Sequence, residues 1–173
     1  RNHQGHITVT SEPGEGTTFT VYLPCGSAAA PVSSHEDAAP PGTGSPHGKG
    51  KVLVMDDEEN IREVAGEMLR FIGYSVEFAD DGAEAVKQYE KALASGEPYA
   101  AVILDLTVPG GMGGSEAMEI LRNMDPDVKA VVSSGYSNDP IMSDYKSFGF
   151  RGIITKPYKL TDLKKVLGEV IGG

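Results

Sequence analysis

The chain has 173 residues, of which 39% are hydrophobic and 23% charged, and its formal net charge is −10 at pH 7. These proportions are typical of a globular protein, and no apolar run approaches the about 20 residues that a transmembrane helix needs. The negative charge disfavours binding to a nucleic-acid backbone, and the single cysteine, Cys25, excludes an internal disulfide bond and a cysteine-clustered metal site. The composition therefore favours a cytoplasmic protein that contacts neither nucleic acid nor membrane directly.

Residues 1–24 predict a β-hairpin. Apolar and polar side chains alternate in residues 7–10 and again in 18–23, and the Pro and Gly residues at 13–16 are typical of a turn between them. An isolated hairpin is only marginally stable in water. We therefore expect this segment to be a fragment of a larger domain or to need a neighbouring surface.

Residues 25–50 differ from the rest of the chain in composition. They are mostly Ala, Pro, Gly, Ser and Thr, and Val32 is the only large aliphatic side chain among them. A segment with so little apolar surface cannot offset the conformational entropy that folding would remove. We predict a flexible linker over residues 25–50.

Residues 51–173 alternate apolar runs with helical patterns. The predicted strands cover 52–55, 74–78, 99–104, 128–132 and 152–155, and the predicted helices cover 61–72, 81–93, 117–124, a short stretch from 140, and 160–170. Continuously apolar strands between amphipathic helices predict a parallel sheet with right-handed crossovers. Five such units are too few for a closed barrel, which needs about eight. The expected fold class is α/β, with a doubly wound, five-stranded parallel sheet and five helices.

Candidate functional residues follow four of the five predicted strands, whereas the second ends in Ala79-Asp80-Asp81 and offers no cation or nucleophile. Asp56 and Asp57 follow the first strand, Asp105 the third, Ser134 the fourth and Lys156 the fifth. In an open α/β sheet the functional crevice lies outside the carboxyl ends of the strands. With the strand order 2-1-3-4-5, the first and third strands are neighbours and the three carboxylates converge. Each residue alone is common at a strand end for structural reasons, but their joint occurrence in one sheet indicates a functional site.

The chemistry of this predicted site follows from its charge. Three carboxylates within about 5 Å repel one another by several kcal/mol, so they need positive charge nearby. Lys156 is one source, and an oxygen-bound divalent cation is the other, for which Mg²⁺ suits a site with few protein ligands. These cations would offset charge on a transferring phosphoryl group. We predict that Asp105 is a nucleophile that forms an acyl phosphate, with the Ser134 hydroxyl as a donor.

Residues 51–171 resemble the receiver domain of two-component response regulators. The resemblance rests on Val52-Leu53-Val54-Met55-Asp56-Asp57-Glu58, Asp105-Leu106 followed by Pro109-Gly110, Ser134-Gly135, and Lys156-Pro157. It implies the flavodoxin-like order 2-1-3-4-5 and a phosphoacceptor role for Asp105, which would take a phosphoryl group from a phosphohistidine. It also implies that Asp56, Asp57, Asp105 and the backbone carbonyl of Thr107 bind Mg²⁺, while Ser134 and Lys156 sense the phosphoryl group.

Two features depart from the family pattern. Ile153 occupies the position, three residues before the lysine, where the family usually has a switch aromatic. Isoleucine has no ring to swing in and out, so Ile153 does not provide the usual coupling between the hydroxyl and an aromatic ring. Tyr136 is an alternative switch residue, although a loop aromatic more commonly serves in packing. The glycine-rich stretch 109–114 is expanded relative to the usual loop. Its four glycines predict a mobile rim around the acceptor.

The N-terminal hairpin has a resemblance of its own. Residues 5–24, with Gly14-x-Gly16-Thr17, resemble the last strands of a histidine-kinase ATPase domain. The asparagine-bearing helix and earlier glycine boxes of that domain are absent, so the segment lacks a complete kinase core and is not expected to bind ATP alone. The order implies the C-terminus of a hybrid sensor histidine kinase within a phosphorelay. Because the sequence stops at Gly173, no DNA-binding output domain is expected. The implied partners are a histidine kinase or a histidine phosphotransfer protein.

Three other functions compete with this interpretation. The first is a receiver-like interaction module that is never phosphorylated, which Ile153 supports weakly. The second is a phosphohydrolase with an aspartyl nucleophile, although such enzymes usually have a second acid where Thr107 stands. The third is a flavodoxin, but its first loop should be rich in Ser, Thr and Gly, whereas residues 56–59 are all acidic and would repel a flavin phosphate.

Overall fold

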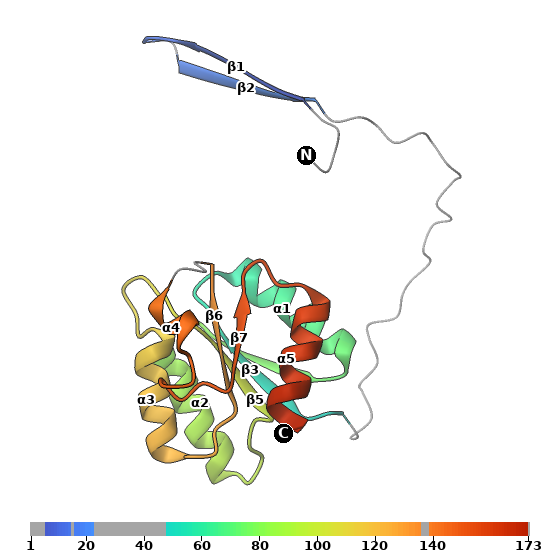
Figure 1. Ribbon diagram of the computed structural model, residues 1–173, viewed down its shortest axis with the longest axis vertical. Coiled ribbons are helices and arrows are strands. Elements are labelled where there is room, and N and C mark those ends of the chain that lie inside the picture. Colours follow the sequence, from blue (N-terminus) through green and yellow to red (C-terminus); the bar gives the residue numbers. More distant parts are fainter. Residues whose placement is uncertain (1–5, 15, 23–47, 136–138, 173) are drawn as a thin grey trace, which may run out of the picture. The chain divides into compact units, whose positions relative to one another are not determined.

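The computed structural model contains two compact units, within Arg1–Gly42 and Thr43–Gly173 (Figure 1). It describes residues 6–14, 16–22, 48–135 and 139–172. Most of the predicted linker, residues 25–47, and the candidate aromatic Tyr136 lie outside the described residues. None of the described helices is both long enough and apolar enough to span a membrane.

The first unit contains the predicted hairpin. Strands β1 (His6–Glu12) and β2 (Gly16–Tyr22) are antiparallel, with Ile7 opposite Val21 and Val9 opposite Phe19. Side chains alternate between the two faces of a strand, so these four apolar residues share one face. Each of them is more than half exposed to solvent. The hairpin therefore has an apolar face that its own residues do not cover.

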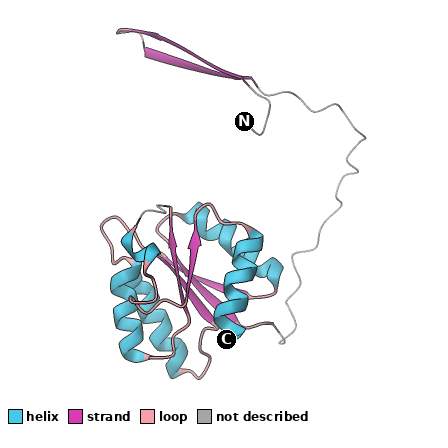
Figure 2. Ribbon diagram, viewed as in Figure 1, coloured by secondary structure: helices cyan, strands magenta, loops and turns pink. Residues whose placement is uncertain are grey.

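The second unit is built on a five-stranded parallel sheet, drawn in magenta in Figure 2. Its spatial order is β4-β3-β5-β6-β7, which is the predicted order 2-1-3-4-5 in the numbering of this unit. The observed strands lie within one or two residues of the predicted ones. They are β3 (Lys51–Met55), β4 (Ser75–Ala79), β5 (Ala101–Asp105), β6 (Ala130–Ser134) and β7 (Gly152–Thr155).

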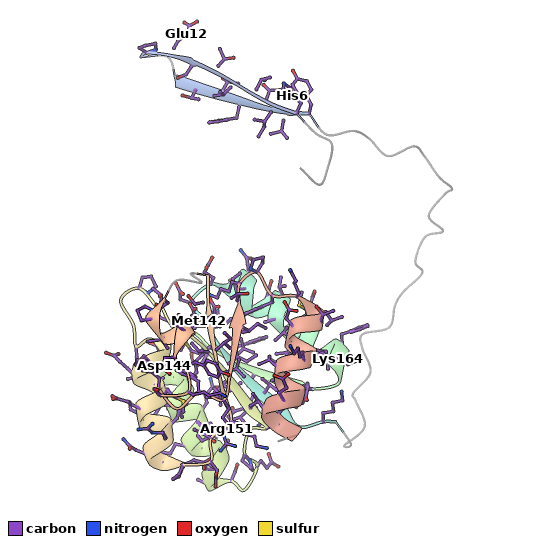
Figure 3. All side chains as sticks on the ribbon, viewed as in Figure 1. His6, Glu12, Met142, Asp144, Arg151 and Lys164 are labelled. Atoms are coloured by element: carbon purple, nitrogen blue, oxygen red, sulfur yellow. The ribbon has the colours of Figure 1, made fainter. Side chains whose placement is uncertain are left out.

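Helices cover both faces of this sheet. They are α1 (Glu59–Ile72), α2 (Gly82–Ala94), α3 (Gly114–Met124), α4 (Pro140–Ser143) and α5 (Leu160–Gly172). One buried apolar cluster joins the sheet to α2, α3 and α4, and a second joins it to α1 and α5. Figure 3 shows the side chains that fill these layers, including that of Met142 from α4. The doubly wound α/β prediction is confirmed.

Local signals in the sequence account for where several helices begin and end. Asp81 Oδ1 accepts a hydrogen bond from the Glu84 amide at 2.8 Å, which caps α2, and the Glu84 side chain accepts a hydrogen bond from the amide of Asp80. Asp139 caps α4 in the same way, with Pro140 in the first turn. Helix α1 ends at Gly73, whose φ of +105° suits glycine.

Candidate functional site

Three carboxylates meet at the carboxyl edge of the sheet. Asp56 and Asp57 follow β3, and Asp105 is the last residue of the neighbouring strand β5. One oxygen from each carboxylate lies within 4.8 Å of the others. Asp56 and Asp105 are buried, whereas Asp57 is exposed. The predicted convergence of these acids is therefore confirmed, and the exposed member leaves the cluster open to solvent on one side.

Lys156 brings its ammonium group into this cluster. Its Nζ atom lies 2.7 Å from Asp56 Oδ2 and 3.0 Å from Asp105 Oδ2, and the side chain is only 13% exposed. The backbone amide of Lys156 donates to the carbonyl of Ser134 at 3.0 Å, and the Lys156–Pro157 peptide is cis. The hydrogen bond joins the end of β7 to the end of β6. The lysine lies beside the acids, as the sequence predicted.

Burial and charge shift the ionisation of this cluster. Burial raises the pKa of Asp105 from 3.8 to about 6, the Lys156 ammonium opposes this rise, and repulsion from Asp56 and Asp57 adds to it. Burial by itself would lower the pKa of Lys156, but its contacts with Asp56 and Asp105 outweigh that effect and raise it. Lys156 therefore stays protonated, while Asp105 takes up a proton more readily than an ordinary aspartate.

Asp56 uses its two carboxylate oxygens differently. Oδ1 accepts a hydrogen bond from the amide of Glu58 at 3.1 Å. Oδ2 is fully buried, and although Lys156 Nζ lies close to it, no donor in the described part of the chain is aligned for a hydrogen bond. A buried carboxylate needs positive charge beside it, and the Lys156 ammonium at 2.7 Å supplies part of that charge. The three carboxylates together form a set of oxygen ligands suited to a hard divalent cation.

The remaining predicted site residues lie around this cluster. Ser134 is the last residue of β6, is buried, and pairs in register with Thr155 of β7. Thr107 is exposed, two residues beyond Asp105. Ile153 lies on the edge strand β7 with 38% of its surface exposed. The structure thus brings Ser134 and Lys156 to adjacent strand ends, and Ile153 is the residue on β7 at the position of the usual aromatic.

The glycines after Asp105 have a reason that the sequence did not reveal. A Cβ atom on Gly113 would lie 2.5 Å from the carbonyl oxygen of Leu106, and one on Gly114 would lie 2.5 Å from that of Asp105. The loop is also held by a hydrogen bond from the Gly82 amide to the Met112 carbonyl at 2.8 Å. Close backbone approach explains why glycine occupies these two positions, and the mobility of the loop stays a prediction.

Sequence reasoning missed two polar contacts beside the acids. The Arg62 guanidinium of α1 donates to the Asp56 carbonyl and forms an ion pair with Asp80 at 2.8 Å. The hydroxyl groups of Ser133 and Tyr158 lie 2.7 Å apart in the interior. Helical periodicity marks Arg62 only as a polar position, and no local pattern pairs a serine with a tyrosine 25 residues away. These contacts depend on how the helices lie against the sheet.

Comparison with known proteins agrees with this geometry. Residues 52–168 match the response regulator receiver domain family. The chain is 30% identical over 172 residues to the sensor kinase CckA of Brucella abortus, covering 96% of this chain and 18% of that kinase. It is also 30% identical over 174 residues to the sensor histidine kinase AtsR of Burkholderia thailandensis, covering 96% and 27%. The chain thus spans less than a third of either kinase.

Solved structures show the same fold. The chemotaxis protein CheY4 of Vibrio cholerae superposes with a TM-score of 0.62 and 28% identity, covering 70% of this chain and 98% of that one. The receiver domain of the sensor histidine kinase PA1611 of Pseudomonas aeruginosa superposes with a TM-score of 0.63 and 24% identity, covering 72% and 98%. With the acid cluster and the lysine at the carboxyl edge of a 2-1-3-4-5 sheet, the chain belongs to the response regulator receiver domain family.

Proposed function

We propose that this chain is the phosphoacceptor module of a two-component phosphorelay, with Asp105 as the acceptor. The observation that carries the proposal is the placement of the Asp105 carboxylate, which lies in a cluster with two other acids and 3.0 Å from the ammonium of Lys156. A nucleophilic carboxylate, a fixed cation and open access on the Asp57 side are what phosphoryl transfer to a side chain requires.

The reaction is a displacement at phosphorus. An oxygen of ionised Asp105 bonds to the phosphorus of a phosphohistidine, the P–N bond breaks, and its electron pair returns to the imidazole of the partner. Lys156 lies where its ammonium can offset charge on the phosphoryl oxygens, and Ser134 at the end of β6 supplies a hydroxyl donor. Hydrolysis of the resulting acyl phosphate would return Asp105 to its starting state.

The carboxylate cluster fits a magnesium ion. Its oxygens lie within 4.8 Å of one another, and the buried Asp56 Oδ2 receives no aligned hydrogen bond from the described residues. The receiver domain of PA1611 has been solved with a magnesium ion coordinated in its active-site cleft. We assign Asp56, Asp57, Asp105 and the backbone carbonyl of Thr107 as the ligands in this chain. When bound, the ion would neutralise developing negative charge on the transferring group.

The partner in this proposal is a histidine kinase or a histidine phosphotransfer protein. The support is the similarity of 96% of this chain to two sensor kinases, including the region before the receiver. We further propose that residues 1–24 end a kinase ATPase domain, that 25–50 link the domains and that 51–173 form the receiver. The uncovered apolar face of the hairpin is consistent with a segment that packs against the rest of a larger domain.

The test is phosphorylation of the full chain by a phosphorylated histidine kinase or by a small-molecule phosphodonor with Mg²⁺. We expect one phosphoryl group per chain, sensitive to hydroxylamine as an acyl phosphate should be, and none in Asp105→Asn. Asp127→Asn is the matched control, because Asp127 is an aspartate whose side chain is 98% exposed. Labelling of Asp105→Asn at the wild-type level would refute the assignment. Absence of labelling and of Mg²⁺ binding in the wild type would favour an interaction module.

A further inference from the structure

Arg62 connects two loops at the border of the acid cluster. Its Nη1 atom donates to the backbone carbonyl of Asp56, in the connection between β3 and α1. Its Nη2 atom lies 2.8 Å from Oδ1 of Asp80, in the connection between β4 and α2. The Arg62 side chain is only 13% exposed, although it carries a full charge. One guanidinium therefore bridges the connections that leave two adjacent strands.

These contacts complete the anchoring of Asp56. Its backbone amide donates to the carbonyl of Ala79 at 3.2 Å, and its Oδ1 atom accepts from the amide of Glu58 at 3.1 Å. With Arg62 on the carbonyl, the amide, the carbonyl and one carboxylate oxygen are all engaged. The remaining carboxylate oxygen, Oδ2, forms an ion pair with the ammonium of Lys156 at 2.7 Å. Arg62 thus helps to fix the direction in which the remaining oxygen of Asp56 points.

We propose that Arg62 is a positioning residue for the divalent-cation site, a role that rests on the function proposed above. Arg62 touches no predicted metal-facing oxygen; it acts through the backbone of Asp56. Groups that orient metal ligands in this way commonly change metal affinity by about 10- to 100-fold when removed.

Electrostatics alone predicts the opposite effect. Arg62 is a cation close to a site for Mg²⁺, so its removal reduces repulsion of the metal ion and should tighten binding. If the arginine positions Asp56, its removal should weaken binding instead. The sign of the change in affinity therefore separates the two roles.

The shape of the arginine side chain provides a second way to distinguish the positioning role from a pure charge effect. A guanidinium presents several N–H donors in a rigid plane and can serve two acceptors at once, whereas an ammonium is a compact charge on a flexible stem. Arg62→Lys keeps the charge but does not reproduce both contacts. Charge alone predicts unchanged Mg²⁺ affinity in this variant, and positioning predicts weaker binding.

The experiment is an NMR titration of the full chain with Mg²⁺, following the amides of Asp57, Glu58 and Asp105. We expect Arg62→Gln to weaken Mg²⁺ binding by about 10-fold and Arg62→Lys to weaken it by a smaller factor. The Glu58 amide, which donates to Asp56 Oδ1, should shift in both variants before metal is added. Arg70→Gln is the control: Arg70 is an exposed arginine of the same helix, its guanidinium lies near the Phe78 ring, and its loss changes the net charge equally.

The outcomes separate this inference from the proposed function. Wild-type chain without saturable Mg²⁺ shifts would refute the metal site and, with it, the role of Arg62. Saturable wild-type binding together with equal or tighter binding by Arg62→Gln would refute the role of Arg62 alone. Weaker binding in both Arg62 variants, with Arg70→Gln close to wild type, would support it. If Arg62→Gln does not fold, the Mg²⁺ affinity of Arg62→Lys distinguishes the two roles. A pure charge effect predicts wild-type affinity for that variant, and positioning predicts weaker binding.

Discussion

The hydroxyl groups of Ser133 and Tyr158 lie 2.7 Å apart, and both side chains are buried. Ser133 pairs in register with Asp105, the last residue of the neighbouring strand β5, and Tyr158 lies two residues beyond Lys156. The segment that carries the lysine is thus held to β6 twice, by this hydroxyl pair and by the hydrogen bond from the Lys156 amide to the Ser134 carbonyl.

We expect Ser133→Ala and Tyr158→Phe each to destabilise the fold by about 1–3 kcal/mol, because each leaves one buried hydroxyl without its partner. The double variant should cost less than the sum of the two, since it removes both polar groups together. Urea unfolding of the four proteins measures this coupling. Strictly additive losses would show that the two hydroxyls do not depend on each other.

The Asp105→Asn variant should be more stable than the wild type at pH 7 when Mg²⁺ is absent. Because burial raises the pKa of Asp105 to about 6, the folded state binds a proton more tightly than the unfolded chain does. The ionised carboxylate therefore destabilises the fold progressively as the pH rises from about 4 to 6. Removing it should add about 1–3 kcal/mol, at about 1.4 kcal/mol per pKa unit.

Unfolding by urea with a metal chelator present tests this prediction, and the pH provides an internal control. At pH 4 the wild-type carboxyl is already protonated in the folded state, so most of the difference between the two proteins should vanish. A variant that is less stable than the wild type at pH 7 would mean that the Asp105–Lys156 ion pair at 3.0 Å outweighs the cost of burial.

Binding of Mg²⁺ should weaken as the pH falls through about 6. A proton on Asp105 competes with the cation, and the raised pKa of this carboxyl places that competition in an accessible range. We expect nearly constant affinity between pH 7 and 8, and a loss of up to about tenfold per pH unit below 6. Mg²⁺ titrations at several pH values measure it. Residual binding by Asp105→Asn should show a flatter profile, and an equally steep profile would assign the proton to another group.

Removing residues 1–47 should leave the unfolding of the receiver unchanged. Every buried member of the two apolar clusters lies between Val52 and Val170, so the described core of the receiver is formed by residues of the second unit. We expect the same midpoint in urea and the same slope for the full chain and for residues 48–173. A lower midpoint for the shortened chain would show that the N-terminal unit stabilises the receiver.

Much of the receiver fold was predictable because its signals are local. Continuous apolar runs such as residues 52–55 indicate strands that are buried on both faces, and they were located within one or two residues. The predicted start of the short helix at residue 140 coincides with the first residue of α4, Pro140. The acids and the lysine were predictable for a further reason, since the carboxyl ends of parallel strands share one edge of the sheet.

Other features were not predictable because they depend on contacts between distant segments. The glycines at 113 and 114 suggested mobility, and only the distance to the carbonyls of Leu106 and Asp105 shows why a side chain does not fit there. Arg62 looked like an ordinary polar position of a helix. Its contacts with Asp56 and Asp80 arise because α1 lies beside the ends of β3 and β4.

The amino-acid sequence by itself determined the order of the elements, the two-sided burial of the central strands and the identity of the charged groups at the strand ends. These follow from periodicity and composition, which act over a few neighbouring residues. Only the tertiary structure decided which oxygen of Asp56 remains without an aligned donor, how close Lys156 lies to Asp105, and that burial raises the pKa of that acid. Those properties depend on distance and on exclusion of water, and both are set by how the whole sheet and its helices pack together.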